Sequence, residues 1–227
     1  MTVARLWRKG IGLLKHADVG LRRRISRPPA GQFQPYNYTL PDRYPWLFEF
    51  AAKELGVGAL RLLSFGCSRG DEIIALRKYF PDSAIKGIDI DARNITACRT
   101  RTAGIPGLSF SVAANLERED AGSYDAIFCL AVLVHGDLTT KGAQRCDPLL
   151  QFSDFERMAR DFYVHLRSGG LLCLHTTNFR LCDTDVAQDF DILLEAAPEQ
   201  LAADVKFDRN NQLMPNVQYR PVIFRKR

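Results

Sequence analysis

The chain is organised around Leu60-Arg61-Leu62-Leu63-Ser64-Phe65-Gly66-Cys67-Ser68-Arg69-Gly70-Asp71-Glu72-Ile73-Ile74-Ala75-Leu76. An apolar run breaks at a glycine loop and then resumes with helical spacing, which predicts a strand, a tight turn and a helix. Gly66 and Gly70 lack a Cβ atom, so a ligand can approach the backbone there while free N–H groups at the helix start point at it. The loop is therefore predicted to be a cofactor cradle.

A dinucleotide-binding loop would need the pattern G-x-G-x-x-G, and this loop departs from it. Ser68 stands at the second glycine position and Asp71 at the third, which compromises the close approach of the backbone to a pyrophosphate. Asp71 and Glu72 also place carboxylates at the helix start, where they would repel a diphosphate. The loop therefore disfavours a nicotinamide dinucleotide.

The same loop satisfies G-x-S-x-G, the nucleophile elbow of α/β-hydrolases, with Ser68 as the nucleophile. Such an elbow follows several strands and an oxyanion loop. Before Leu60, however, the sequence predicts one helix and a proline-rich segment, with no glycine cluster. A hydrolase that uses Ser68 remains an alternative function.

Acidic residues beside the loop suit a third ligand, S-adenosylmethionine (SAM), which carries a sulfonium and an ammonium group and no phosphate. A nucleotide site of this kind has a second acid at the end of the next strand, where it accepts hydrogen bonds from the ribose hydroxyls. Asp89 closes the apolar run that starts at Ala84, about 20 residues beyond the loop, which is the expected offset. The pattern therefore predicts a SAM site.

Four segments resemble class I SAM-dependent methyltransferases. They are Phe65-Gly66-Cys67-Ser68-Arg69-Gly70-Asp71-Glu72, which looks like motif I of that family, Asp89-Ile90-Asp91, Tyr124-Asp125-Ala126-Ile127-Phe128-Cys129 and Leu166-Arg167-Ser168-Gly169-Gly170-Leu171-Leu172. The first is similar to the chemotaxis-receptor methyltransferase branch. The resemblance covers roughly residues 60–175 in order. It implies a SAM-dependent enzyme with a doubly wound α/β fold: a mostly parallel, Rossmann-like seven-stranded sheet that ends in an antiparallel hairpin.

Candidate cofactor-binding residues lie in the loop or at the ends of predicted strands. They are Gly66, Cys67, Ser68, Gly70, Asp71, Glu72, Asp89, Ile90, Asn115, Leu116, Leu130 and Ala131. The resemblance implies that Asp71 or Glu72 holds the amino-acid part of SAM, and that Asp89 holds the ribose. It assigns the adenine amino group to Asn115, for which a simple turn-forming role is the alternative.

Candidate acceptor-site residues surround the expected cofactor mouth. His135 follows a buried strand and titrates near neutrality, so it is the candidate catalytic base; a loop histidine without a role is the alternative. The aromatic segment 35–44 is expected to lie over the mouth or simply to pack on the sheet edge. The candidate substrate-binding residues are Tyr36, Tyr38, Tyr44, His175 and Asn178. No metal site is predicted, because the six cysteines are spread singly, which indicates free thiols.

Charge divides the 227 residues into a basic N-terminal extension, residues 1–31, and one domain, residues 32–227. The extension has eight Lys or Arg against one Asp, and the remainder has two more acidic than basic residues. The body is therefore not expected to bind nucleic acid. The loosely amphipathic extension could contact an anionic membrane surface or an acidic partner, or be a solvated tail.

No apolar run reaches the roughly 18 residues of a membrane span, and no signal peptide is visible. The sequence therefore predicts a cytoplasmic protein, or one peripheral at the membrane.

The methyl acceptor is not specified by a motif. Leu130-Ala131 stand where the receptor branch usually has Arg-Asn, which argues against a receptor glutamate. The sequence also lacks the Asn/Asp-Pro-Pro-aromatic and Pro-Cys motifs of nucleic-acid methyltransferases. We expect an O or N nucleophile of a small molecule or cell-envelope precursor. A protein carboxylate, or SAM binding without transfer, is the alternative.

Local patterns also predict individual elements. Helices are expected at 45–55, 71–79, 92–102 with Asp91 as N-cap, 186–197, and after a capping box at Ser153-Asp154-Phe155-Glu156. Residues 205–208 and 219–224 are expected to form the C-terminal hairpin through Asn210-Asn211, with the second strand starting near Pro221.

Overall fold

The computed structural model describes residues 31–37, 39, 42–56 and 58–227. Tyr38 and residues 1–30 of the basic extension lie outside them, so the predicted membrane or acidic-partner contact stays a prediction. Among the described residues, no helix combines the length and the apolar character needed to cross a bilayer. The same residues contain no group of three His, Cys, Asp or Glu placed to hold a metal ion.

Strands and helices alternate along most of the chain. In order they are α2 (Pro45–Leu55), β1 (Arg61–Phe65), α3 (Asp71–Tyr79), β2 (Ala84–Asp89), α4 (Ala92–Arg101), β3 (Leu108–Val112), β4 (Tyr124–Leu130), α5 (Gly136–Thr140), α6 (Phe152–His165), β5 (Leu166–His175), β6 (Phe190–Glu195), β7 (Lys206–Phe207), β8 (Leu213–Met214) and β9 (Pro221–Lys226). Single 3-10 turns lie at Leu181–Asp183, Ala187–Asp189 and Pro198–Gln200.

Seven strands form one sheet in the order β3-β2-β1-β4-β5-β9-β6. Strands β1 to β5 pair in parallel, whereas β9 pairs antiparallel with both β5 and β6. The chain order reverses between β1 and β4, and in doubly wound sheets ligands bind outside the carboxyl ends of the strands at such a point. The predicted fold class is confirmed, and the topology places a site beside Gly66.

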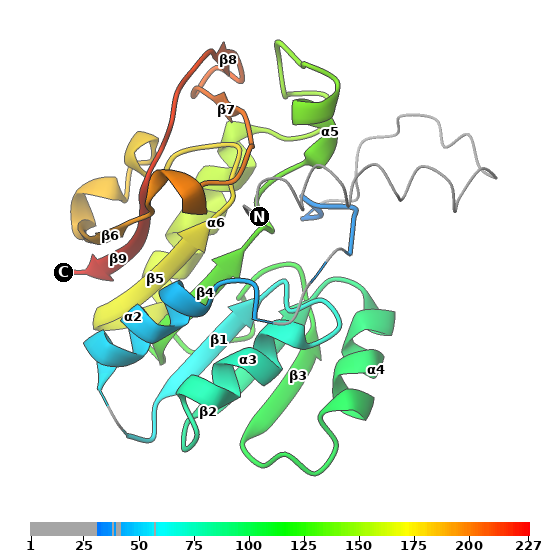
Figure 1. Cartoon of the computed structure of the whole chain (residues 1–227), viewed down its shortest axis with the longest axis vertical. Helices are drawn as coiled ribbons and strands as arrows, with labels where there is room; N and C mark the ends of the chain where they lie inside the picture. The colour runs from blue at the N-terminus through cyan, green and yellow to red at the C-terminus, as the bar shows by residue number, and fades with distance from the viewer. Residues whose placement is uncertain (1–30, 38, 40–41, 57) are drawn as a thin grey trace.

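Both faces of the sheet are covered, as a largely parallel sheet requires. Alternate residues of one strand belong to different cores: Leu62 packs with residues of α2, α3 and α4, and Leu63 packs with residues of α6. Figure 1 shows α2 and α3 on the near face and α6 behind the sheet. Strand β1 is therefore packed on both faces, and the loop that follows it starts from a fixed position.

Helices α2, α3 and α4 lie where the sequence predicts them. Asp91 caps α4: its Oδ1 accepts a hydrogen bond from the backbone N–H of Arg93 at 2.8 Å. Helix α6 begins earlier than predicted, at Phe152, and its N-cap Gln151 makes no side-chain bond, so the predicted capping box is wrong. The amide of Phe152 donates instead to Oδ1 of Asn211 at 2.8 Å, a cap supplied by a residue remote in sequence.

Two predictions for the C-terminal third are wrong. Residues 186–197 form a 3-10 turn and strand β6, because β9 offers this apolar segment a pairing edge and tertiary pairing overrides a short helical pattern. Residues 206–207 pair with β8 instead of β9, since Asp208 Oδ1 accepts from the amides of Asn210 and Gln212 and closes a tighter turn. Strand β9 does begin at Pro221, as predicted.

Candidate active site

A cavity of about 570 Å³ lies at the carboxyl ends of β1, β2 and β4, a size typical of ligand pockets. Many of the residues singled out in the sequence line it: Gly66, Cys67, Ser68, Asp71, Glu72, Asp89, Ile90, Leu130, Ala131, Tyr36 and Tyr44. The glycine loop, the end of β2 and the segment before α2 therefore meet around one space.

The glycine loop has a conformation that its sequence permits. Gly66 has φ +75°, and a Cβ atom there would lie 2.4 Å from Cγ2 of Val132, the second residue after β4. The amides of Gly66 and Cys67 both donate to the carbonyl of Ile88, at 2.8 and 3.0 Å. The loop is thus pinned to β2 on one side and packed on the β4 connection on the other.

Ser68 carries the clearest unmet polar group in the cavity wall. Its backbone N–H donates to Asp89 Oδ2 at 2.9 Å, whereas its buried Oγ has no hydrogen-bond partner among the described residues. A buried hydroxyl without a partner is costly and indicates a ligand or water that supplies one. A hydrolase would instead need a base within hydrogen-bond reach of this atom; the described residues supply none, so the geometry does not support the nucleophile elbow.

Asp89 is held rigidly at the cavity edge. Its Oδ1 accepts from the backbone N–H of Asp91 at 2.8 Å and from Nδ2 of Asn94 at 3.0 Å. With the bond from Ser68, three donors orient the carboxylate. Oδ2 accepts only one of these bonds, so it keeps acceptor capacity for a ligand hydroxyl.

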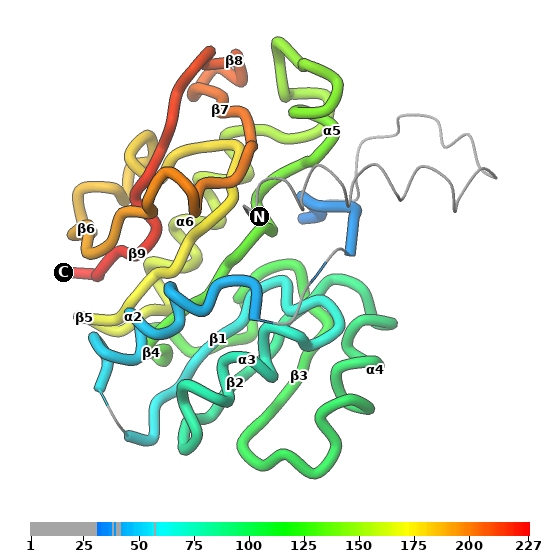
Figure 2. Tube along the Cα trace, viewed as in Figure 1, coloured from blue at the N-terminus to red at the C-terminus, as the bar shows by residue number. Residues whose placement is uncertain are grey.

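A segment that precedes α2 forms the opposite rim of the cavity. Asn37 and Asn94 exchange two amide hydrogen bonds, of 3.3 and 3.2 Å, and the Tyr36 hydroxyl donates to Asp137 of α5 at 2.8 Å. Figure 2 shows residues 31–37 running beside α5. Because Asn94 also donates to Asp89, the rim and the end of β2 share one hydrogen-bond network.

Glu72 is a half-buried carboxyl in the cavity wall. Burial raises its pKa to about 7, although the Ser64 hydroxyl, which donates to its Oε1 at 2.6 Å, and the charge of Arg43 both favour ionisation. A cationic ligand beside Glu72 would favour the carboxylate. This wall therefore suits an ammonium group.

Glu72 should make stability depend on pH. Below its unfolded-state pKa of 4.5 the carboxyl is protonated in both states. As the pH rises to about 7, the unfolded chain loses the proton first, so the folded protein is destabilised. Chemical denaturation from pH 4.5 to 7.5 should show Glu72→Gln gaining stability over wild type up to about pH 7, with no further gain above.

The matched control for this titration is Glu117→Gln, because Glu117 is exposed. Its difference from wild type should change little over the same range. A difference for Glu72→Gln that stays constant with pH would contradict the raised pKa.

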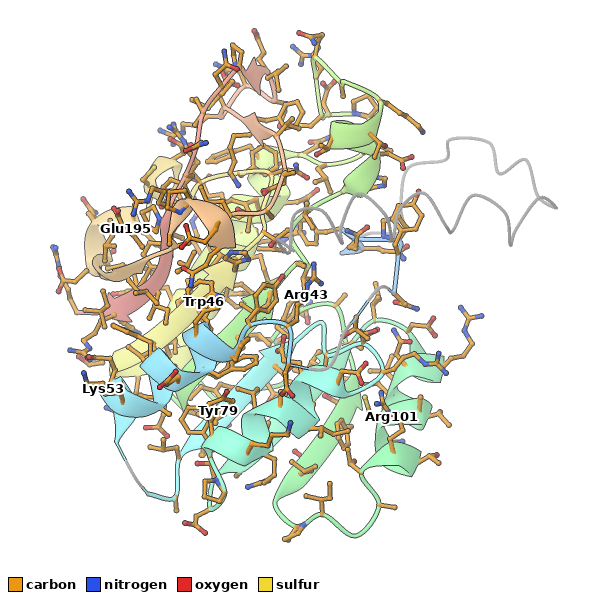
Figure 3. The ribbon with its side chains drawn as sticks, in the orientation of Figure 1. Arg43, Trp46, Lys53, Tyr79, Arg101 and Glu195 are labelled. Atoms are coloured by element: carbon orange, nitrogen blue, oxygen red, sulfur yellow. The ribbon has the colours of Figure 1, made fainter. Side chains whose placement is uncertain are left out.

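Arg43 lines the cavity but was not among the residues predicted from the sequence. Its guanidinium lies 5.1 Å from the centre of the Tyr44 ring, and Figure 3 shows it before α2, towards the middle of the molecule. It is the only basic residue in the segment 35–44, a signal that could have revealed it. The guanidinium can pair with a carboxylate in the cavity.

Three non-glycine residues adopt left-handed backbone angles directly after parallel strands or within three residues of them. They are Ser68 after β1, Ala131 after β4 and Thr176 after β5, with φ of +47°, +60° and +59°. Such angles are costly for residues with a Cβ atom and cluster at functional sites. Ser68 and Ala131 line the cavity, and the Thr176 hydroxyl lies 3.4 Å from that of Tyr44.

Three predicted acceptor-site residues do not line this cavity. His135 caps α5, where its Nδ1 accepts from the amide of Asp137 at 3.3 Å, and burial lowers its pKa; its ring packs against Tyr36, which does line the cavity. His175 is bonded to Thr176 and to the carbonyl of Gln200, and burial lowers its pKa to about 4. Asn178 links the amide of His135 to the carbonyl of Val205.

Three predicted cofactor residues also lie outside the cavity lining. Gly70 caps α3 with φ +92°, Asn115 Oδ1 accepts from the amide of Glu117 at 3.4 Å, and Leu116 is fully buried in the core. Ala113 and Ala114 line the cavity at the end of β3 instead. Asn115 has the turn-forming contact that was its alternative role.

Known proteins resemble the central part of this chain. Residues 63–172 match the family model described as "Methyltransferase domain". No curated protein matches the chain.

Several solved structures share a part of the fold. Geranyl diphosphate C-methyltransferase from Streptomyces coelicolor A3(2) is 17% identical with a TM-score of 0.41, covering 56% of this chain and 43% of that one. A putative sarcosine dimethylglycine methyltransferase from Galdieria sulphuraria is 16% identical with a TM-score of 0.43, covering 57% and 44%. Phosphoethanolamine N-methyltransferase 2 from Haemonchus contortus, in complex with SAM, is 16% identical with a TM-score of 0.44, covering 60% and 29%.

The chain spans less than half the length of each of these three proteins. The finer resemblance to the chemotaxis-receptor branch is not supported, because the match is to the general methyltransferase domain. That match covers the glycine loop, Asp89 and the parallel strands around the point between β1 and β4 where the chain order reverses. Over residues 63–172 the chain is therefore similar to a methyltransferase domain.

Proposed function

We propose that this protein transfers a methyl group from SAM to an oxygen or nitrogen nucleophile of a small molecule or cell-envelope precursor. The observation that carries the proposal is the cavity beside Gly66, which is lined by Glu72, by Asp89 and by Ser68, whose hydroxyl has no partner among the described residues. These groups fit a cationic nucleoside: they offer acceptors to hydroxyls and an ammonium group, and a phosphate would be repelled.

The residues divide the work of holding the cofactor. Three donors fix the Asp89 carboxylate, which supports its role as the acceptor for the ribose hydroxyls; Glu72, also in the cavity lining, pairs with the ammonium group. Arg43, which also lines the cavity and whose charge acts on Glu72, can neutralise the cofactor carboxylate. When bound, SAM supplies an electrophilic methyl group on a sulfonium.

The acceptor side is the rim made by Tyr36, Tyr44 and the β4 end. Burial and the bond to Asp137 raise the pKa of Tyr36 to about 12, so its phenol stays protonated and positions the rim through Asp137. Alignment of a nucleophile with the methyl group is the main requirement of such a reaction. Leu130 and Ala131 make the wall next to it apolar, which supports a neutral acceptor atom over a receptor carboxylate.

Methyl incorporation tests this proposal. SAM with a labelled methyl group is incubated with the full chain and a lysate, which is then separated into small-molecule, envelope and protein fractions. We expect label in the small-molecule or envelope fraction, and background label with Asp89→Ala.

Base-labile label in the protein fraction would instead indicate a protein carboxyl methyltransferase. Calorimetric binding of SAM without label in any fraction would indicate a protein that binds the cofactor but transfers nothing. Absence of binding would contradict the proposal as a whole.

A further inference from the structure

Two cysteines meet directly behind the cofactor loop. The Sγ atoms of Cys67, in the loop, and Cys98, on α4, are 3.9 Å apart. Both side chains are buried, and Cys67 also lines the cavity. The pair comes from segments 31 residues apart in sequence, so no spacing motif reveals it.

The Cys98 thiol supports the loop. Its Sγ donates to the carbonyl of Ser68 at 3.1 Å, and it lies 3.2 Å from the position that a Cβ atom would take at Gly70. The contact between the two thiols lowers the pKa of Cys98 and raises that of Cys67. The loop is therefore supported by the thiol of Cys98, which is itself in contact with the thiol of Cys67.

We propose that Cys67 and Cys98 form a dithiol site that a hydroperoxide oxidises reversibly to a disulfide, and that the disulfide weakens cofactor binding. One thiol attacks the terminal oxygen of the hydroperoxide: an S–O bond forms, the O–O bond breaks, and the other oxygen leaves as an alcohol or water, so the attacking sulfur becomes a sulfenic acid. The second thiol displaces water from that sulfur and forms the S–S bond. The two thiols lose two electrons and two protons in total, and the hydroperoxide accepts them.

Oxidation changes the loop for two reasons. An S–S bond is about 2.05 Å long, so the two sulfur atoms must approach each other and draw the loop towards α4. The disulfide also has no S–H group, so the carbonyl of Ser68 loses its donor from Cys98. Both changes act on Ser68, a cavity-lining residue whose buried Oγ has no hydrogen-bond partner among the described residues.

Binding and oxidation are then coupled in both directions. If the disulfide lowers the affinity for SAM, bound SAM lowers the tendency to oxidise by the same factor. Cys67 lines the cavity, so the cofactor also shields it from the oxidant. The coupling between SAM binding and oxidation rests on the proposed function, whereas the formation of the disulfide does not.

The test uses the full chain treated with hydrogen peroxide, alkylated and digested with trypsin. Mass spectrometry should detect peptides 62–69 and 94–99, which contain Cys67 and Cys98, joined and released again by dithiothreitol. Calorimetry should show SAM affinity about tenfold weaker after oxidation, the effect of one lost buried hydrogen bond, and restored after reduction. SAM added before the peroxide should slow the joining.

Two variants control the result. Cys98→Ser keeps a hydroxyl donor for Ser68 but cannot form the disulfide, so its SAM affinity should not respond to peroxide. Cys182→Ser removes the exposed cysteine and should respond as wild type does. Thermal melting shows whether Cys98→Ser is folded, and Cys67→Ser replaces it if not.

The absence of the joined peptides at peroxide levels that oxidise Cys182 would overturn the proposal. So would an equal loss of affinity in wild type and in the serine variant. If SAM did not bind at all, the proposed function would fail while the peptide analysis still decided the dithiol site.

Discussion

Replacement of Gly66 by alanine is expected to destabilise the protein by about 2–5 kcal/mol. A residue with a Cβ atom at φ +75° costs about 1–2 kcal/mol. The added atom would also lie 2.4 Å from Cγ2 of Val132, and overpacking of this kind costs about 1–3 kcal/mol. Urea denaturation with a two-state fit measures the sum.

The two contributions can be separated. Gly104 has φ +83°, but nothing lies within 4 Å of the position that an added Cβ atom would take there, so Gly104→Ala should show the backbone cost alone. Adding Val132→Ala to Gly66→Ala should recover the packing cost and leave the backbone cost. A Gly66→Ala variant no less stable than Gly104→Ala would show that the contact with Val132 yields easily.

Asp89→Asn is expected to weaken SAM binding about 10- to 100-fold. A hydrogen bond to a charged group is worth about 1.5–3 kcal/mol, and each 1.4 kcal/mol is a factor of ten in affinity. Asparagine also replaces one of the two carboxylate oxygens with an NH2 group, which cannot accept a hydrogen bond. The backbone N–H of Ser68 or of Asp91 would then lose its acceptor. Calorimetry with SAM and with its demethylated product measures the loss.

Asp91→Asn is the matched control for this substitution. Asp91 also lines the cavity, but its carboxylate caps α4, and asparagine is an equally good N-cap. We therefore expect folding and SAM affinity close to wild type. An equal loss in the two variants would contradict the separate roles of the two acids, and melting curves exclude an effect of unfolding.

Local and periodic features could be predicted from the sequence. The apolar run before Gly66, the helix after Gly70, Asp91 as a cap and Asp89 at a strand end all depend on residues close together in the chain. Elements whose partners are remote were predicted wrongly: β6 at 190–195 is a strand because β9 pairs with it, and α6 is capped by Asn211. In short segments the spacing of apolar residues does not distinguish a helix from a strand, so the tertiary pairing decides which of the two forms.

The sequence by itself determined the fold class and the glycine loop between β1 and α3, because glycines, carboxylates and strand periodicity act over a few residues. Only the tertiary structure decided which candidates share the cavity: it brought in Arg43 and the paired thiols of Cys67 and Cys98, and it gave His135, His175 and Asn178 structural contacts. Those distances arise where strands meet across the sheet, and contacts between remote segments leave no periodic signal in the chain.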